Sequence, residues 1–269
     1  METIRRSLPN GVLEGTFDPR FRAVADELER NFRERAEDGA SVCVHHEGRK
    51  VVDLWGGSAD PASQRPWTED TVSVVFSCTK GATALCAHVL ASRGALDLYP
   101  PVTEYWPEFG SHGKERATVR MMLDHSVGLP AFRAPVRPGG FHDWDHMTDL
   151  LAAAEPFWKP GTRNGYHMVS FGWTVGEIVR RVSGRSLGAF FQEEIAGPLG
   201  IDFWIGLPEE HEPRVAPMII YLPQPAEPPG AFTETLLANP QPLQALSLLN
   251  SRGFDPNSRA AHAAEIGGA

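Results

Sequence analysis

The spacing of apolar residues changes near Gly39. Before it, between residues 18 and 38, apolar side chains recur at steps of three or four, which predicts one amphipathic helix. These side chains are Phe21, Val24, Leu28 and Phe32. Asp18 followed by Pro19 suits the helix start, because it supplies a cap and then a fixed φ, and Gly39 suits its end.

Beyond Gly39 the pattern becomes that of strands. Residues 40–46 and 50–57 are apolar and β-branched, and the polar stretch 47–49 between them predicts a hairpin. A third short run, residues 71–76, is interpreted as a strand or as an extended lead into the next element. These runs predict a sheet in the N-terminal part of the chain.

Helical periodicity dominates after that sheet. The predicted helices cover residues 77–94, 118–130, 144–154, 170–184 and 186–200, with weaker helical character over 231–249. Residues 207–230 are rich in proline and lack a period, so they are interpreted either as a lid over a site or as a connector. Strands followed by helices predict an α+β fold and not an alternating βαβ fold.

Neither an internal repeat nor a linker divides the chain cleanly. We therefore expect a single unit, with the sheet at its N-terminal end and a mainly helical part that opens with the 77–94 helix. The expected division is 1–75 for the sheet-forming part, 76–250 for the mainly helical part, and 251–269 for a tail, all within one unit, 1–269.

Composition narrows the functional classes. The chain has 269 residues, of which 42% are hydrophobic, so it can bury a sizeable core. Its formal net charge of -9 argues against nucleic acid as a partner, because a phosphate-binding surface needs a basic excess. Three cysteines do not suggest a disulfide framework, and free thiols fit a reducing compartment. Without a secretory leader or a long apolar stretch, the expectation is a cytoplasmic protein with no membrane span.

Ser77 and Lys80 form an S-x-x-K tetrad at the start of a predicted helix. A three-residue step on a helix places both side chains on one face, about 5 to 6 Å apart at Cβ. Burial lowers the pKa of a lysine amine, and a neutral amine can accept the hydroxyl proton of a serine. Backbone N–H groups at a helix N-terminus also stabilise a developing oxyanion. The tetrad therefore indicates a serine nucleophile, Ser77, activated by Lys80.

Taken alone, the same tetrad also fits a capping serine followed by a surface lysine. Its context favours the chemical interpretation. An apolar run leads into Ser77, and small residues fill the next turns, which suits a buried central helix. These small residues are Gly81, Ala82 and Ala84.

Longer segments carry a family resemblance. They are VSVVFSCTKGATALCAHVLASRGALDLYPPVTEYWPEF, ATVRMMLDHSVGLP and PGTRNGYHMVSFGWTVGEIVRRVSGRSLGAFFQEEIAGPLGI. Together with the strand pair, they resemble the β-lactamase-related serine hydrolases over most of residues 10–216. This family includes class C β-lactamases, penicillin-recognising peptidases and esterases, and the segments are most similar to the esterase-like branch. The resemblance implies a β-lactamase/transpeptidase-like fold, in which helices pack on an antiparallel sheet.

The resemblance also implies roles for individual residues. Ser77 would be the acyl-forming nucleophile and Lys80 its proton partner. Tyr166 matches the tyrosine of the family's second motif and would shuttle a proton between Ser77 and the leaving group; by itself it would be interpreted as a core aromatic. Tyr105 and Trp158 are candidates for lining an acyl pocket, and Met168 is the third candidate substrate-binding residue.

Two departures from the family pattern bear on the substrate. The third position of the second motif is Met168, where β-lactamases carry an asparagine that binds the substrate amide. A thioether cannot replace those donors, so a simple ester is favoured over a lactam or peptide. The third motif, Lys- or His-x-Gly on a late strand, is absent, so the C-terminal strands are expected to be missing. An unfinished sheet would leave an edge that a second copy of the chain could cover.

Two other groups of residues have competing interpretations. His125, in LDHSVGL, looks like a site histidine, but the resemblance places it in a structural helix end. The acidic and histidine residues of 142–146 lack the spacing of a zinc site, so neither a metal nor another cofactor is expected. The leading hypothesis is an esterase acting through an acyl-serine. The alternatives are a β-lactamase or D-alanyl peptidase, and an inactive scaffold that binds a ligand.

Overall fold

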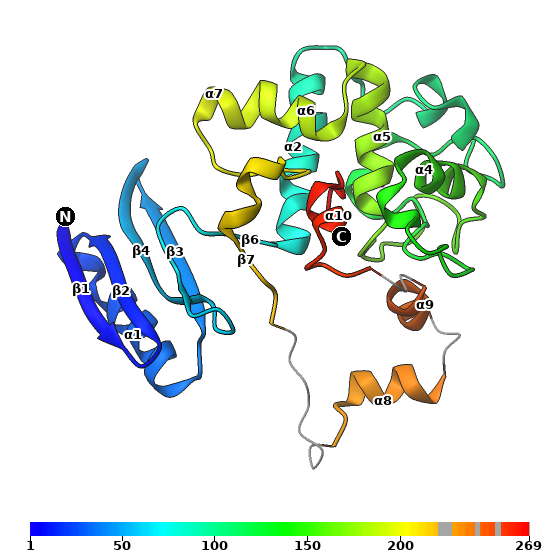
Figure 1. Ribbon diagram of the computed structural model, residues 1–269. Helices are drawn as coiled ribbons and strands as arrows, with labels where there is room; N and C mark the ends of the chain where they lie inside the picture. Colours follow the sequence, from blue (N-terminus) through cyan, green and yellow to red (C-terminus); the bar gives the residue numbers. More distant parts are fainter. Residues whose placement is uncertain (220–227, 240–242, 251–253, 269) are drawn as a thin grey trace. The chain divides into compact units, whose positions relative to one another are not determined.

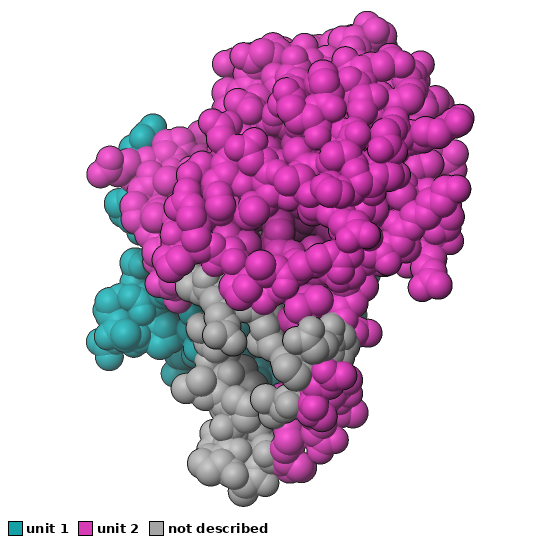
Figure 2. All heavy atoms as spheres, turned by 90° about the vertical axis from the view of Figure 1, so that its right-hand side faces the viewer, with its two compact units in different colours: residues 1–74, 210–220 teal, residues 75–209, 221–269 magenta. Residues whose placement is uncertain are grey.

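A computed structural model describes residues 1–219, 228–239, 243–250 and 254–268 (Figure 1). The chain forms two compact units, residues 1–74 with 210–220, and residues 75–209 with 221–269 (Figure 2). The expected division along the chain placed 210–220 in the helical part. The structure groups this segment with the sheet unit because one of its strands pairs there.

The first unit is built on an antiparallel sheet with the strand order β1-β2-β4-β3. A further short strand, β5, pairs with the far end of β4. The strands are β1 (Glu2–Leu8), β2 (Gly11–Phe17), β3 (Gly39–His46), β4 (Arg49–Asp60) and β5 (Arg65–Pro66). β1 and β3 therefore form the two outer edges of this path.

The hairpin predicted from residues 40–57 is confirmed as β3 and β4. Its turn residues Glu47 and Gly48 have φ values of 50° and 75°, the left-handed pair that a tight antiparallel turn requires. The hairpin of β1 and β2 was not predicted. Its signal was present in Pro9-Asn10, two residues typical of turns, between two runs of alternating burial; Gly11 is the first residue of β2 and pairs with Leu8.

The helix predicted over residues 18–38 is confirmed in its central part as α1, Arg22–Glu34. A short 3₁₀ turn, Pro19–Phe21, precedes it and is capped by Asp18, whose carboxylate accepts a hydrogen bond from Arg20 N–H. The helix ends before Gly39, in a stretch where Ala36 adopts a φ of 53°. Its apolar stripe is buried together with sheet residues in the core of this unit.

A two-stranded parallel ladder completes the first unit. Only β6, Val72–Ser73, forms from the run 71–76, and it pairs with β7, Val215–Ala216. β7 follows a short 3₁₀ segment, Glu209–Arg214. Residues 207–230 are interpreted from the sequence as a lid or a connector. Part of this segment, residues 220–227, lies outside the described residues.

Helices make up the second unit. They are α2 (Thr79–Ser92), α3 (Val119–Leu123), α4 (Trp144–Ala153), α5 (Phe171–Ser183), α6 (Leu187–Phe191), α7 (Gly197–Leu199), α8 (Ala231–Ala238), α9 (Leu243–Leu249) and α10 (Arg259–Ala263). Short 3₁₀ turns lie at Phe76–Cys78, Val102–Glu104, Pro107–Phe109 and Gly140–His142. In the part of the chain that the structure describes, no helix has the length and apolarity needed to cross a membrane.

Two predicted helices are shorter or less regular than expected. The helix expected over 118–130 covers only α3, because His125 takes a left-handed φ of 63° soon after it. The helix expected over 186–200 starts as predicted at the cap Ser186, but continues through a π-helical turn, Gln192–Ala196, before α7. The predictions for α4 and α5 agree with the structure to within one residue.

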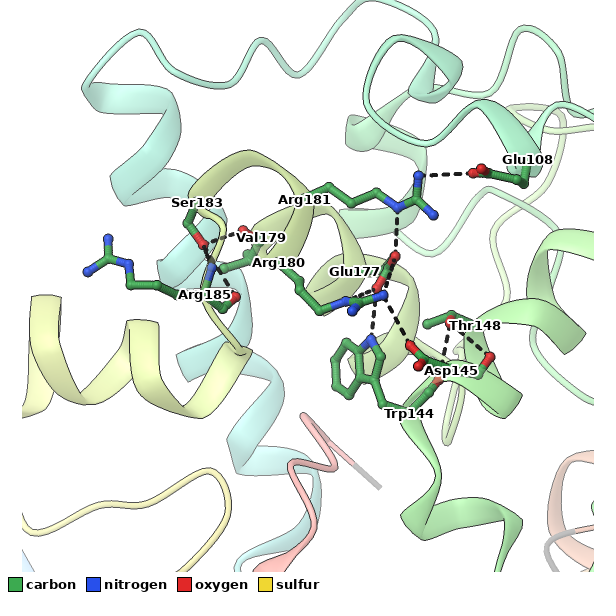
Figure 3. Close-up of polar contacts among 10 residues, drawn as sticks. All are labelled: Glu108, Trp144, Asp145, Thr148, Glu177, Val179, Arg180, Arg181, Ser183 and Arg185. Atoms are coloured by element: carbon green, nitrogen blue, oxygen red, sulfur yellow. Dashed lines mark hydrogen bonds and ion pairs between the residues drawn. The ribbon is translucent and has the colours of Figure 1, made fainter.

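A buried carboxylate ties α4 to α5 inside the helical unit. The side chain of Glu177 is completely buried and accepts hydrogen bonds from Trp144 Nε1 at 2.7 Å, Arg180 Nε at 2.7 Å and Arg181 Nε at 2.6 Å (Figure 3). Because a buried charge is costly unless it is paired, this arrangement fixes how the two helices pack. It also orients α5, which begins a few residues after Tyr166.

Candidate active site

Ser77 lies in a turn that leads into α2. It belongs to the 3₁₀ turn Phe76–Cys78, and α2 begins two residues after Ser77. Phe76, directly before it, has a φ of 43°, a conformation that costs a bulky side chain free energy. This strained turn holds a half-buried serine at the helix N-terminus, where backbone N–H groups create positive potential.

Lys80 lies one helical turn further on and is buried, with 7% of its surface exposed. Its Nζ lies 3.1 Å from Ser77 Oγ and donates to the carbonyl oxygens of Met168, at 2.6 Å, and Gly268. No carboxylate is among the hydrogen-bond partners of this amine in the described residues. A neutral amine has two hydrogens and one lone pair. When the amine is neutral and directs both hydrogens to the carbonyls, its lone pair is left for the serine hydroxyl, whereas the charged amine donates to Ser77 Oγ.

The pKa of Lys80 suits this role. Burial disfavours the charged form and lowers the pKa from 10.5 to about 8. A substantial fraction of the amine is therefore neutral in mildly alkaline solution, and this fraction can accept a proton from Ser77.

Tyr166 reaches the same amine from a distant part of the chain. The Nζ of Lys80 lies 5.0 Å from the centre of the Tyr166 ring. Tyr166 precedes α5, and α5 packs beside α2 (Figure 1). The structure thus brings together the three residues that sequence reasoning assigned to the chemistry.

Sequence reasoning missed two supports of the site. One is the carbonyl of Gly268, 188 residues away from Lys80 along the chain. The other is His167, whose Nε2 accepts from Leu129 N–H at 2.9 Å and whose Nδ1 pairs with Gly165 O at 2.6 Å. A backbone carbonyl leaves no mark in a sequence, and His167 carried no signal beyond its place next to Tyr166.

The buried ring of His167 should make the stability of the protein sensitive to acid. Burial lowers its pKa from 6.5 to about 4, so the unfolded chain takes up the proton first as the pH falls. Stability from the neutral ring is complete above pH 6.5 and is lost between pH 6.5 and about 4, by about 3 kcal/mol. Urea unfolding at several pH values should show a steeper loss for the wild type than for His167→Gln. Equal slopes for the two proteins would contradict this account.

The three predicted substrate-binding residues lie in different places. Trp158 packs over Gly165, next to Tyr166, and its Nε1 donates to Ser126 O at 3.1 Å. Met168 contributes its carbonyl to Lys80, while its side chain packs against the core.

Tyr105 is not brought to the nucleophile. Its hydroxyl oxygen accepts from Asp97 N–H at 2.9 Å, beyond the C-terminal end of α2. Ser77 precedes the other end of this 14-residue helix, which is about 20 Å long. The structure therefore gives Tyr105 a structural contact and does not support a place in an acyl pocket.

A pocket of about 370 Å³ also opens in this unit, but it does not contain the reacting groups. Aromatic and charged side chains line it, including Trp144, Trp173, Arg180 and Glu265. Arg180 is already paired with Glu177 inside the unit. The chemistry at Ser77 therefore lies outside this pocket. Among the described residues, no three His, Cys, Asp or Glu side chains gather as a metal site would require.

Sequence comparison places these residues in a known family. The model of the family described as Beta-lactamase matches residues 25–263. The relative named Esterase/beta-lactamase LipL, of Mycobacterium tuberculosis, is 40% identical over 210 residues, covering 77% of this chain and 48% of the relative. Esterase EstB of Burkholderia gladioli is 32% identical over 199 residues, covering 68% of this chain and 50% of the relative.

Solved structures agree with this fold. A family VIII carboxylesterase superposes with a TM-score of 0.83 at 38% identity, covering 95% of this chain and 66% of that chain. EstA from Arthrobacter nitroguajacolicus superposes with a TM-score of 0.81 at 30% identity, covering 100% of this chain and 66% of that chain. The chain spans about half the length of the two named sequence relatives. With the β-lactamase/transpeptidase-like fold and the family match over residues 25–263, the chain belongs to the beta-lactamase family.

Proposed function

We propose that this protein is a serine hydrolase that cleaves small carboxylic esters through an acyl-Ser77 intermediate. One observation carries the proposal: the buried Lys80 amine lies 3.1 Å from Ser77 Oγ while two carbonyls accept its hydrogens. Relatives named as esterases, LipL, EstB and a family VIII carboxylesterase, support the same reaction class.

The proposed reaction has two halves. Ser77 Oγ attacks the ester carbonyl carbon as its proton passes to Lys80 Nζ, and the tetrahedral intermediate then collapses with loss of the alkoxide. Tyr166 gives this leaving group a proton and is reprotonated from Lys80. Water then attacks the acyl-serine, releases the carboxylic acid and returns the proton to Ser77, so that the enzyme is regenerated.

An ester is proposed in preference to a lactam because Met168 occupies the place of an amide-binding asparagine. A lactam is the second candidate substrate, because the relative LipL is named both an esterase and a β-lactamase. Exposed free thiols at Cys43 and Cys78 support a reducing, cytoplasmic setting. We also propose that a second copy covers the outer edge of β3, which light scattering would detect as a dimer.

Covalent labelling tests the proposed function. A fluorophosphonate should add one mass increment to the wild type and none to Ser77→Ala, and p-nitrophenyl butyrate turnover should follow the same pattern. Ser92→Ala is the matched control, because Ser92 is an exposed serine at the other end of α2. Nitrocefin in place of the ester distinguishes a lactamase. Absence of both adduct and turnover in folded wild type would sink the proposal and favour an inactive scaffold.

A further inference from the structure

His125 contacts the residues on both sides of Tyr166. The N–H of Gly165 donates to the His125 carbonyl oxygen at 3.1 Å. The N–H of His167 donates to His125 Nδ1, also at 3.1 Å. One residue therefore binds the backbone immediately before and immediately after the candidate proton shuttle.

The conformation of His125 makes this double contact possible. Its φ of 63° is left-handed, which is uncommon outside glycine and is often kept at functional sites. Its ring centre lies 5.0 Å from that of Tyr166 and 5.0 Å from that of Phe171, the first residue of α5. The ring thus packs between the shuttle and the helix that follows it.

Tyr166 needs such support because its own hydroxyl does not hold it in place. The residue is 53% exposed, and its hydroxyl makes no hydrogen bond among the described residues. The direction of the phenol therefore depends on the backbone of residues 165–167 and on the rings packed against it. His125 contributes to both of these supports.

The accepting nitrogen of His125 must be unprotonated, so the ring is neutral with its hydrogen on Nε2. Four titratable groups face this ring: Lys80, Asp124, Tyr166 and His167. Burial and the charge of Lys80 lower the pKa of His125 against the opposing effect of Asp124. The neutral ring that the contact needs is thus the form favoured near pH 7.

We propose that His125 is a positioning residue for the reaction, holding the Tyr166 phenol against Lys80 and Ser77 by clamping Gly165 and His167. This inference rests on the proposed function. His125 acts through Tyr166 and takes no proton from the substrate. Its removal should lower kcat and leave KM almost unchanged, because ester binding does not use the clamp.

The test compares substitutions that keep or remove the accepting atom. His125→Asn keeps an acceptor near the position of Nδ1, and asparagine tolerates a left-handed φ. His125→Leu removes the acceptor. With p-nitrophenyl butyrate, His125→Leu should lose about 10²-fold in kcat with KM within twofold, a loss typical of misplaced catalytic groups. His125→Asn should stay within about fivefold of the wild type.

His112 provides a matched control. It is an exposed histidine of the same unit with a φ of 53°, so His112→Leu carries a similar backbone penalty away from Tyr166. Its kcat should remain at the wild-type value. In a Tyr166→Phe background, His125→Leu should cause no further loss, because the residue it positions has already lost its hydroxyl.

A second readout does not depend on turnover. Amide hydrogen exchange at His167 should become more than tenfold faster in His125→Leu than in His125→Asn or in the wild type, because the acceptor is gone. A folded His125→Leu with wild-type kcat would overturn the proposal, and so would an equal loss of kcat in the Tyr166→Phe background. If the wild type neither turns over nor labels, the proposed function has failed, and unchanged exchange at His167 would separately exclude the clamp.

Discussion

Replacing Lys80 with methionine is expected to lower kcat/KM for p-nitrophenyl butyrate by about 10⁴-fold. Methionine has a similar length and can fill the buried space, but it offers no lone pair basic enough to accept the Ser77 proton. The contact that is lost joins Nζ to Ser77 Oγ over 3.1 Å. Steady-state kinetics of the folded protein, checked by circular dichroism, measure the effect.

The pH dependence gives this prediction a sharper form. Since the neutral amine is the active form and the pKa of Lys80 is about 8, wild-type kcat/KM should rise with pH and level off above about 8. Lys114 is a matched control: it is buried like Lys80, and burial lowers its pKa to about 8 as well. Its amine donates to Ala154 O.

Lys114→Met should therefore keep the wild-type inflection near pH 8 and the activity of its folded fraction, even if it unfolds more easily. Lys80→Met should show no such inflection in its residual rate. Retention of more than a tenth of the activity by Lys80→Met would contradict the role given to the amine. If both variants lost the inflection near pH 8, the inflection would reflect folding and not the protonation of Lys80.

Replacing Glu177 with leucine is expected to lower the free energy of unfolding by about 3 kcal/mol. The carboxylate is completely buried, and its removal leaves Trp144 Nε1 without its acceptor. Arg180 and Arg181 each lose one of two carboxylate partners and keep Asp145 and Glu108, respectively. The value lies at the low end for a buried pair because the side chains of Arg180 and Arg181 are 41% and 31% exposed, so water can partly replace the carboxylate. Urea unfolding followed by tryptophan fluorescence measures the loss.

Glu193→Leu is the matched control. Glu193 pairs with Arg185 at 2.6 Å, but its side chain is 58% exposed, so about 0.5 kcal/mol or less is expected. Burial would raise the pKa of Glu177, but hydrogen bonds from Arg180, Trp144 and Arg181 outweigh it and lower the pKa. Its stabilisation is thus present above pH 4.5 and is lost as the pH falls through the lowered pKa, so the comparison belongs near pH 7. Similar losses for the two variants would refute the account.

Local patterns predicted the elements that the chain builds from near neighbours. The helical stripe gave α1, the apolar periodicity of 170–184 gave α5, and the polar turn 47–49 gave the hairpin of β3 and β4. Each is decided by contacts a few residues apart, which a sequence displays directly. The unpredicted hairpin of β1 and β2 belongs to the same class, since its turn residues Pro9 and Asn10 were visible in the sequence.

The irregular regions depended on tertiary packing. α3 stops early because His125 turns back toward Gly165 and His167, a contact that spans about forty residues and has no periodic signal. Tyr105 looked suited to a pocket by its chemistry, but the fold places its hydroxyl beside Asp97.

The sequence by itself determined that a serine and a lysine share one face of a helix, because their spacing of three residues matches one helical turn. Only the tertiary structure decided that Tyr166 and the carbonyls of Met168 and Gly268 surround that lysine. Only burial within the fold lowers the pKa of its amine to about 8. The physical reason is that spacing fixes the direction of neighbouring side chains, whereas desolvation and long-range contacts arise from the packed chain as a whole.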